Sequence, residues 1–482
     1  MKHKPNVLLI MCDQLRADVL GCYGNPLVKT PHIDRLAEQG VCFDRAYSET
    51  PVCMPARHGL LSGLHPFQLG LVENGPLSTE ITHPLPEMIR RQGYATLAIG
   101  KMHFCPPRRH YGFDRMMLSE EMSGHIQDDD FLQFLQARGF GHVSQPHGMR
   151  SDHYYVPQIS PLPEEFHTTA WTGAQTCEAI RKNRNRPFFI FTSFIKPHPP
   201  FDPCEPYNTL YPPEQIPLPI RAESERATDD YLIDVQNDYK VNGIDRVTSV
   251  QEARIRAAYY GSVTQIDVQI GNILRTLEKC DLVEDTLILF TSDHGEMLGD
   301  HYAYGKRTFY EASARIPLIV SQPGILPMGK RREQLAILED IYATLLIASG
   351  SEVPPASCGV DLRQAISNSS TPLRDEIFGE IGRGPAAKMM LRWGDFKYVY
   401  HVNGGAETLF HLGDDPDELQ NIATDHQDLC AYAKRRMERH YNDYSFTEVL
   451  EGAELLRLPK QNHTPRGYLN QYPKWPLTVV KD

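Results

Sequence analysis

NVLLIMCDQLRADVLGCYGNPLVKTPHIDRLAEQG, residues 6–40, is the stretch that decides the fold class. It opens with a continuous, mostly apolar run of the kind that forms a buried strand. After a turn region, Thr30 can cap a helix, Pro31 suits the first helical turn, and Gly40 suits the end of the helix. The stretch therefore predicts a strand, a loop and a helix in succession.

The same pattern recurs along the chain. Helices expected at about 84–93, 170–182 and 250–280 lead into the apolar segments ATLAIG, PFFIFTSF and TLILFTSDHG, and a further short strand, IPLIV, follows at 316–320. Strands that alternate with helices pair in parallel and are covered by helices on both faces. The sequence thus predicts an α/β fold with a large, mostly parallel sheet.

Polar residues follow several of these strands. Asp13, Lys101, His198 and Asp293 each come directly after an expected strand or within a few residues of its end. Ligands of open parallel sheets bind at the carboxyl ends of the strands. These four residues are therefore the first candidates for a functional site.

The pattern divides the chain into three parts. Residues 1–370 carry the α/β pattern, 371–451 read as short strands followed by a helix, and 452–482 contain four prolines and little periodicity. We predict a large catalytic domain, a smaller C-terminal α+β subdomain, and an extended arm that packs on the body or on a second subunit of a homo-oligomer. Two long excursions, 112–168 and 199–245, are candidates for pocket walls.

Composition limits the classes of partner. The 482 residues include 49 Lys and Arg against 61 Asp and Glu, a net charge of -12, which argues against nucleic-acid binding. No apolar run approaches the roughly 20 residues of a membrane span. The ten cysteines include no Cys-x-x-Cys pair, and the apolar run that begins at Val7 is shorter than a signal-peptide core. We therefore expect a cytoplasmic protein with reduced thiols.

One segment carries a specific motif. ETPVCMPARHGLLSG, residues 49–63, contains Cys-x-Pro-x-Arg at Cys53 and Arg57. This motif resembles the signature of the type I sulfatases, members of the alkaline-phosphatase superfamily. Further blocks occur in the family's order: GKMH from 100, KPHPPF from 196, SDHGEMLGDH from 292, GKRTFYEASARIP from 305 and LFHLGDDPDELQNIA from 409.

The resemblance implies an alkaline-phosphatase-like fold and hydrolysis of sulfate esters. It also implies that a maturation enzyme oxidises Cys53 to formylglycine, whose hydrated aldehyde is the nucleophile. A diol has a chemical advantage over a serine or cysteine, because its second hydroxyl can expel sulfate by C–O cleavage and restore the aldehyde.

The resemblance further implies one divalent cation held by Asp13, Gln14, Asp293 and His294. A hard cation lowers the pKa of the nucleophile and balances the negative charge of the transition state. Oxygen donors favour Ca²⁺, which we rank first. Many sulfatases carry Asp-Asp and Asp-Asn in these positions, and the nitrogen of His294 makes Mn²⁺ or Zn²⁺ an alternative.

The remaining site residues are also carried over by resemblance. Arg57 would hold and orient the diol, and Lys101 and Lys306 would bind sulfate oxygens. His103 would contact the diol and take the proton that lets sulfate leave, whereas His198 would protonate the departing alcohol. A supporting role is expected for His301.

Two further side chains, Lys196 and Arg383, are weaker candidates for the pocket and its rim. The organic part of the substrate has no specific signal, and a small sulfated carbohydrate is our first expectation. Two other functions stay open. A phosphonate monoester or phosphodiester hydrolase shares the same motifs, and a catalytically silent binding protein could retain the fold.

Overall fold

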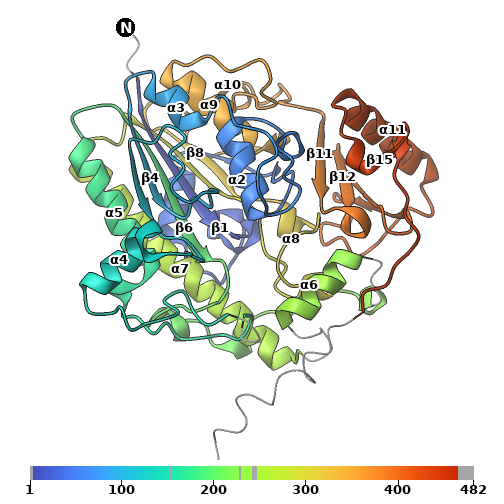
Figure 1. The fold of residues 1–482 in the computed structure, drawn as a ribbon, viewed down its shortest axis with the longest axis horizontal. Coiled ribbons are helices and arrows are strands. Elements are labelled where there is room, and N and C mark those ends of the chain that lie inside the picture. The colour runs from blue at the N-terminus through green and yellow to red at the C-terminus, as the bar shows by residue number, and fades with distance from the viewer. Residues whose placement is uncertain (1–3, 151–153, 227–229, 242–246, 465–482) are drawn as a thin grey trace, which may run out of the picture.

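The computed structural model describes residues 4–150, 154–226, 230–241 and 247–464. Its centre is a twisted eight-stranded sheet with the order β5-β4-β6-β1-β7-β8-β2-β9 (Figure 1). Strands β5, β4, β6, β1 and β7 are mutually parallel. The strands are β1 Asn6–Asp13, β2 Val41–Phe43, β4 Ala95–Gly100, β5 Arg115–Leu118, β6 Phe188–Pro197, β7 Thr286–Ser292, β8 Leu318–Ser321 and β9 Lys330–Arg332.

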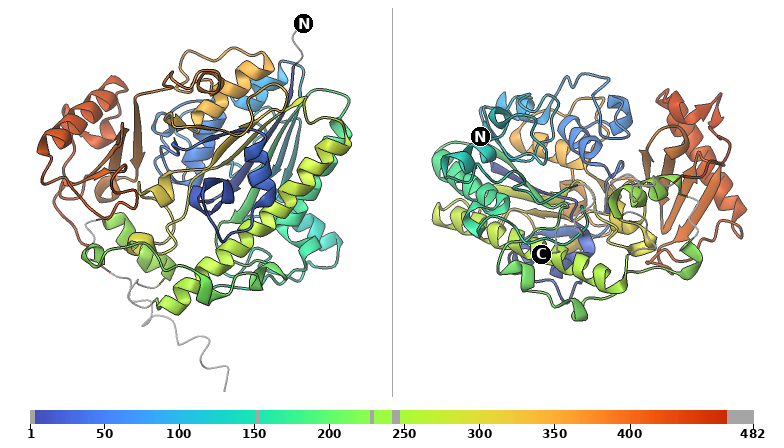
Figure 2. Two further views of the ribbon diagram at one scale, coloured as in Figure 1. Left: turned by 180° about the vertical axis from the view of Figure 1, so that it is seen from behind. Right: turned by 60° about the horizontal axis from the view of Figure 1, so that its bottom comes forward.

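The two faces of this sheet bury two separate apolar cores. Along β1, Leu8 and Ile10 enter one core and Val7 and Leu9 enter the other, because successive side chains of a strand point to opposite faces. Helices α1, α4, α5 and α7 contribute to the first core, and α2, α3, α9 and α10 to the second (Figures 1 and 2). Burial on both faces explains why the strand reads as an unbroken apolar run.

Four helices match the predicted segments to within a few residues: α1 Pro31–Glu38, α3 Leu85–Arg90, α5 Thr168–Asn183 and α7 Ser249–Lys279. Further helices of this part of the chain are α2 Cys53–Ser62, α4 Asp130–Ala137, α6 Tyr231–Val241, α8 Glu311–Ala314, α9 Glu339–Ser349 and α10 Arg363–Ser367. The predicted α/β architecture is confirmed. Helices α4 and α6 lie inside the two long excursions, where the sequence had shown only weak periodicity.

A second sheet lies beside the first. Strands β11 Glu376–Ile381, β12 Lys388–Trp393, β13 Phe396–His401 and β14 Ala406–His411 form an antiparallel meander, and α11 Gln427–Asp443 packs on it (Figure 1). The smaller C-terminal α+β region is therefore present. The exact boundaries at 370 and 451 stay predictions.

The described part of the predicted arm lies on the body. Strands β15 Leu450–Glu451 and β16 Glu454–Leu455 form a short hairpin, and Gln461 then exchanges two hydrogen bonds with Asn403. His463 lies 3.2 Å from Asp238 of α6. Residues 465–482 are outside the described residues, so the predicted role of the arm in a homo-oligomer stays untested. Within the described ranges, we find no helix whose length and hydropathy would suit a bilayer.

Candidate active site

Four adjacent strands deliver their polar ends to one edge of the large sheet. Asp13 ends β1, Lys101 follows β4, His198 follows β6, and Asp293 follows β7. The strand order β4-β6-β1-β7 makes these neighbours in space, and all four side chains are almost completely buried. The structure therefore brings together the four strand-end residues that the sequence singled out.

Cys53 is the first residue of α2 and points into this group. Its Sγ lies 3.0 Å from Lys306 Nζ, 3.3 Å from His294 Nε2 and 3.7 Å from Asp13 Oδ1. The position at a helix N-terminus favours negative charge, because the unpaired amide groups of the first turn point toward it. The motif cysteine is thus placed where Lys306, His294 and the helix N-terminus stabilise an anion, while the carboxylate of Asp13 opposes one.

Arg57 follows Cys53 by about one helical turn and is 2% exposed. Its Nε donates a 2.9 Å hydrogen bond to Asp293, and its Nη1 donates to the carbonyl of Lys101 and the hydroxyl of Ser193. Its Nη2 also donates to Asp13 at 3.4 Å. In this structure Arg57 therefore holds the two metal-candidate carboxylates in place.

The charges around Cys53 shift its acidity. Burial alone would raise the pKa of the thiol, but Lys306, Lys101 and His294 outweigh burial, and the pKa lies well below its usual value. Burial and the charge of Asp13 raise the pKa of Asp293. The site therefore stabilises an anion at position 53, while its paired carboxylates repel each other.

The residues present fit a divalent cation. One ligand atom each from Asp13, Cys53, Asp293 and His294 lies within 4.8 Å of the others. Two carboxylates supply hard oxygen donors, and the buried His294 adds a nitrogen. The fourth predicted ligand, Gln14, lies beside them, but its Oε1 accepts a 2.8 Å hydrogen bond from Lys306.

Two carboxylates of the site were missed by the sequence analysis. Glu121 forms ion pairs with Lys101 at 2.6 Å and Arg150 at 2.5 Å, and its Oε2 lies 3.4 Å from His198 Nε2. Glu296 accepts hydrogen bonds from Gln14, from Tyr155 and from the backbone amide of Gly305. No residue pattern marks Glu121. Glu296 stands inside the SDHGEMLGDH block, which could have drawn attention to it.

His198 is buried between a backbone carbonyl and Glu121. Its Nδ1 lies 2.6 Å from the carbonyl oxygen of Pro199, which leaves Nε2 directed toward the carboxylate. Burial lowers the pKa of His198 to about 4, against the opposing effect of Glu121. The imidazole is therefore neutral near pH 7 in the substrate-free protein.

These groups open into a cavity of about 500 Å³. Its lining includes six residues that were named above from the sequence or the charge network: Cys53, His103, Glu121, Arg150, His198 and Lys306. It also includes Asn74, Phe104, Tyr154, Lys240 and Arg307. Burial, and then the charge of Lys306, lowers the pKa of Lys240 to about 7. The cavity is large enough for a small organic ester and is rich in cationic side chains.

Three residues around the cavity adopt the left-handed backbone conformation. Gln14 has φ 66°, His103 has φ 59°, and Arg307 has φ 69°. Residues other than glycine rarely adopt this conformation, and such positions cluster at functional sites because the surrounding structure must hold them. His103 Nδ1 is buried, and among the described residues it has no hydrogen-bond partner.

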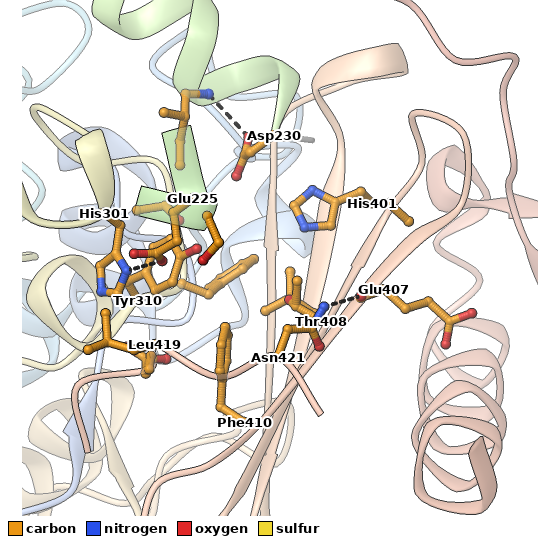
Figure 3. A pocket seen from close by; sticks show the side chains of 17 residues that line it. Glu225, Asp230, His301, Tyr310, His401, Glu407, Thr408, Phe410, Leu419 and Asn421 are labelled. Atoms are coloured by element: carbon orange, nitrogen blue, oxygen red, sulfur yellow. Dashed lines mark hydrogen bonds and ion pairs between the residues drawn. The ribbon is translucent and has the colours of Figure 1, made fainter. Parts of the chain in front are cut away.

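The weaker sequence candidates lie elsewhere. Lys196 is buried against Asp202 and the carbonyl of Pro200, and Arg383 pairs with Glu448 on the surface. His301 lines a second cavity of about 420 Å³ between α6 and the small sheet, where it binds Glu225 and stacks on Tyr310 (Figure 3). None of these three side chains lines the cavity that contains Cys53.

Comparison with known families gives two matches. The family described as Sulfatase matches residues 5–351, and the family described as N-sulphoglucosamine sulphohydrolase, C-terminal, matches residues 299–443. The first match covers the large sheet and the Cys53 cavity. The second covers all four strands of the small sheet and α11.

Individual relatives are similar over most of their length. An arylsulfatase of Clostridium perfringens is 32% identical over 87% of this chain and 90% of its own. A choline-sulfatase of Rhizobium meliloti is 30% identical over 94% of this chain and 90% of its own. The crystal structure of a phosphonate monoester hydrolase of Agrobacterium radiobacter superposes with a TM-score of 0.80, at 29% identity over 94% of this chain and 100% of that chain.

Proposed function

The chain belongs to the sulfatase family and is a sulfuric ester hydrolase, and we propose that it releases inorganic sulfate from a small sulfated carbohydrate at Cys53. One observation carries this proposal: Cys53 lies at the helix N-terminus between Lys306, His294 and Asp13, and it lines the cavity. Once Cys53 is oxidised, the hydrated formylglycine would supply the nucleophilic hydroxyl, and Asp13, Gln14, Asp293 and His294 would hold a divalent cation whose charge activates it. We rank Ca²⁺ first.

The lysines are placed to bind the sulfate group. Lys306 Nζ lies 3.0 Å from Cys53 Sγ, and Lys101 Nζ lies between Asp13 and Glu121. Both ammonium groups are buried, so their attraction for sulfate oxygens is screened less than on the surface. They would hold the sulfur atom in line with position 53 and balance the charge that spreads over the oxygens.

Glu121 and His198 form the proton-transfer pair of this proposal. A general acid must carry a proton on the nitrogen that faces the oxygen of the departing alcohol, and must lie within hydrogen-bond distance of that oxygen. His198 Nε2 faces the Glu121 carboxylate, which stabilises the protonated ring. In this proposal His198 donates that proton, and Glu121 stabilises the imidazolium. His103 removes a proton from the diol at position 53.

The cavity favours a sugar over a quaternary amine. Choline is recognised by aromatic cages, whereas this cavity presents Arg150, Lys240 and Arg307 beside the rings of Phe104 and Tyr154. Two carboxylates also line it, but Glu120 already accepts hydrogen bonds from two backbone amides, and Glu121 is paired with Lys101 and Arg150. Cationic side chains repel a trimethylammonium group and attract hydroxyls and anionic substituents. This lining supports a sulfated carbohydrate and argues against choline sulfate.

A second candidate function is phosphonate monoester hydrolysis. The phosphonate monoester hydrolase of Agrobacterium radiobacter is 29% identical to this chain. A phosphonate monoester hydrolase of Silicibacter pomeroyi is 27% identical, with a TM-score of 0.78. Both reactions require in-line attack on a tetrahedral anion with cationic stabilisation, so the same lysines and carboxylates would serve either one.

A substrate panel separates the two. Enzyme coexpressed with a formylglycine-generating enzyme is assayed on sugar sulfates, choline sulfate, aryl sulfates and phenyl phosphonate monoesters, with kcat/KM as the readout. We expect the highest value for a sugar sulfate. A higher kcat/KM on the phosphonate would reverse the order of the two candidates, and a higher value on choline sulfate would overturn the carbohydrate assignment.

A further inference from the structure

A second cluster of potential metal ligands lies outside the active site. Glu49 Oε2 lies 2.9 Å from His65 Nδ1, and the ligand atoms of Glu49, His65 and Cys358 all lie within 4.8 Å of one another. Glu49 and His65 are buried, and Cys358 is partly buried. The backbone amide of Cys358 donates a 2.9 Å hydrogen bond to Gly63, which ties the segment after α9 to the end of α2.

The donor set has the chemistry of a zinc site. Zn²⁺ takes thiolate sulfur, imidazole nitrogen and carboxylate oxygen at about 2.0–2.3 Å in a tetrahedron, so its ligand atoms lie about 3.3–3.7 Å apart. The 2.9 Å between Glu49 and His65, and the limit of 4.8 Å that holds for all three pairs, are compatible with a shared cation after side-chain adjustment. Calcium or magnesium would not select the sulfur donor.

A buried carboxyl oxygen without a hydrogen-bond partner lies near the cluster. Glu339 in α9 is 1% exposed, and its Oε2 has no hydrogen-bond partner among the described residues. Burial and the charge of Glu49 raise the pKa of Glu339 well above its usual range, while His65 acts in the opposite direction. Glu339 is therefore close enough to the cluster to sense both residues electrostatically.

A third buried carboxyl group lies close to the cluster. Glu380 of β11 is 2% exposed, and burial and the charge of Glu49 raise its pKa to about 8. The nearby Arg374 already donates two hydrogen bonds to Asp340. A buried carboxyl group without a cationic partner holds a proton, and a bound divalent cation would take the place of such a proton.

We propose that Glu49, His65 and Cys358 form a second metal site, which takes a thiophilic divalent cation of the zinc class. Glu339 or a water molecule completes the tetrahedron. On binding, the sulfur–zinc bond would replace the S–H bond of Cys358, and zinc would also displace the proton that His65 and Glu49 share in their hydrogen bond. Both protons leave to solvent, with no change of oxidation state.

The site joins three parts of the molecule. Glu49 and His65 flank the Cys53 helix in sequence, Cys358 lies in the segment between α9 and α10, and the backbone of Gly379 in β11 packs against the carbonyl of Glu49. The cation would therefore fasten the loops at both ends of α2 to the segment that leads to the small sheet. Its effect is on stability, and it is independent of the active-site cation.

Metal content and cobalt spectra test the proposal. The full chain carrying Cys53→Ala is used as background, because this change removes the thiol at the active site. The protein is dialysed against chelator, reloaded with Zn²⁺ or Co²⁺, and freed of unbound metal. We expect Cys358→Ser and His65→Gln each to lose about one zinc per chain, and the thiolate-to-cobalt charge-transfer band to disappear in Cys358→Ser.

Two controls make the result specific. Cys280→Ser, at the end of α7, replaces a partly buried cysteine far from the cluster in sequence and should keep both the zinc and the band. Asp293→Asn should keep the second zinc while it weakens the active-site cation. Unchanged zinc content in both Cys358→Ser and His65→Gln, or a cobalt complex without the charge-transfer band in the Cys53→Ala background, would overturn the proposal. The cluster would then be a network of protonated carboxyl groups.

Discussion

Replacing Glu121 by Gln tests the effect of the Glu121 charge on His198, because the change removes the negative charge and keeps the size and shape of the side chain. The carboxylate lies 3.4 Å from His198 Nε2 and also binds Lys101 and Arg150. Two unit charges at this separation interact by about 5 kcal/mol at an effective dielectric constant of about 20. Lys101 and Arg150 lie against the same carboxylate and offset part of its field at His198. We therefore expect the pKa of His198 to fall by about 1–2 units in the variant.

The sign of this effect follows from the direction of the shift. Glu121 raises the pKa of His198, whereas burial lowers it to about 4. In Glu121→Gln the pKa of His198 falls further, so less of the ring is protonated at any given pH. A loss of 1–2 units corresponds to a loss of about 10- to 100-fold in the protonated fraction.

Substrates with different leaving groups give the assay. For a sugar sulfate, whose alcohol needs a proton, kcat/KM should fall by about 10- to 100-fold, whereas nitrophenyl sulfate should lose less than about threefold. Arg150→Gln is the matched control, because it leaves the carboxylate beside His198 intact and should raise KM for both substrates. Equal losses on both substrates in Glu121→Gln would refute the proton-transfer role and leave Glu121 only as the residue that positions Lys101 and Arg150.

Three further predictions follow from the site and its support. Asp293→Asn should remove about one equivalent of the active-site cation and lower turnover by about 100-fold or more, and unchanged metal content would contradict the ligand assignment. Because burial lowers the pKa of Lys240 to about 7, its positive charge is present below that pH and lost above it. KM for an anionic substrate should therefore rise by about threefold or more between about pH 6 and pH 8. Lys240→Arg should flatten this rise, because arginine keeps its charge over this range. If the rise persisted in the variant, Lys240 would be excluded as its origin. Asp129 caps α4 by accepting a hydrogen bond from the amide of Leu132, and its other oxygen accepts one from the amide of Glu120 outside the helix. Asp129→Ala should therefore lower the free energy of unfolding by about 1–2 kcal/mol in urea titrations, and a change below about 0.3 kcal/mol would contradict the cap.

The strand ends were predictable because they follow a local rule. An apolar run buried on both faces stands out in the sequence, and the residue that ends it lies at the ligand-binding edge of a parallel sheet. Asp13, Lys101, His198 and Asp293 meet for this reason, although Asp13 and Asp293 are 280 positions apart. The small sheet was predictable for a similar reason, since its strands alternate with clear turn signals.

The residues that complete the cavity follow no local rule. Glu121, Arg150 and Tyr154 lie in an excursion whose course depends on tertiary contacts, and Lys240 lies on a helix within the second excursion. Their partners are distant in sequence, and long-range pairing of side chains leaves no periodic pattern. The short strands β2 and β9 were missed as well, because three-residue strands are below the length at which alternation can be recognised.

Release of inorganic sulfate by the matured enzyme and by its Cys53→Ala variant tests the central claim most directly. Ion chromatography follows sulfate from the best sugar sulfate of the panel, and mass spectrometry of the peptide that contains position 53 determines whether the cysteine has been oxidised to the aldehyde. We predict that sulfate release requires the oxidised residue, rises in proportion to the oxidised fraction, and is abolished in Cys53→Ala while the melting temperature changes little. Sulfate release by Cys53→Ala at the rate of the parent enzyme would contradict the assignment of Cys53 as the nucleophile precursor.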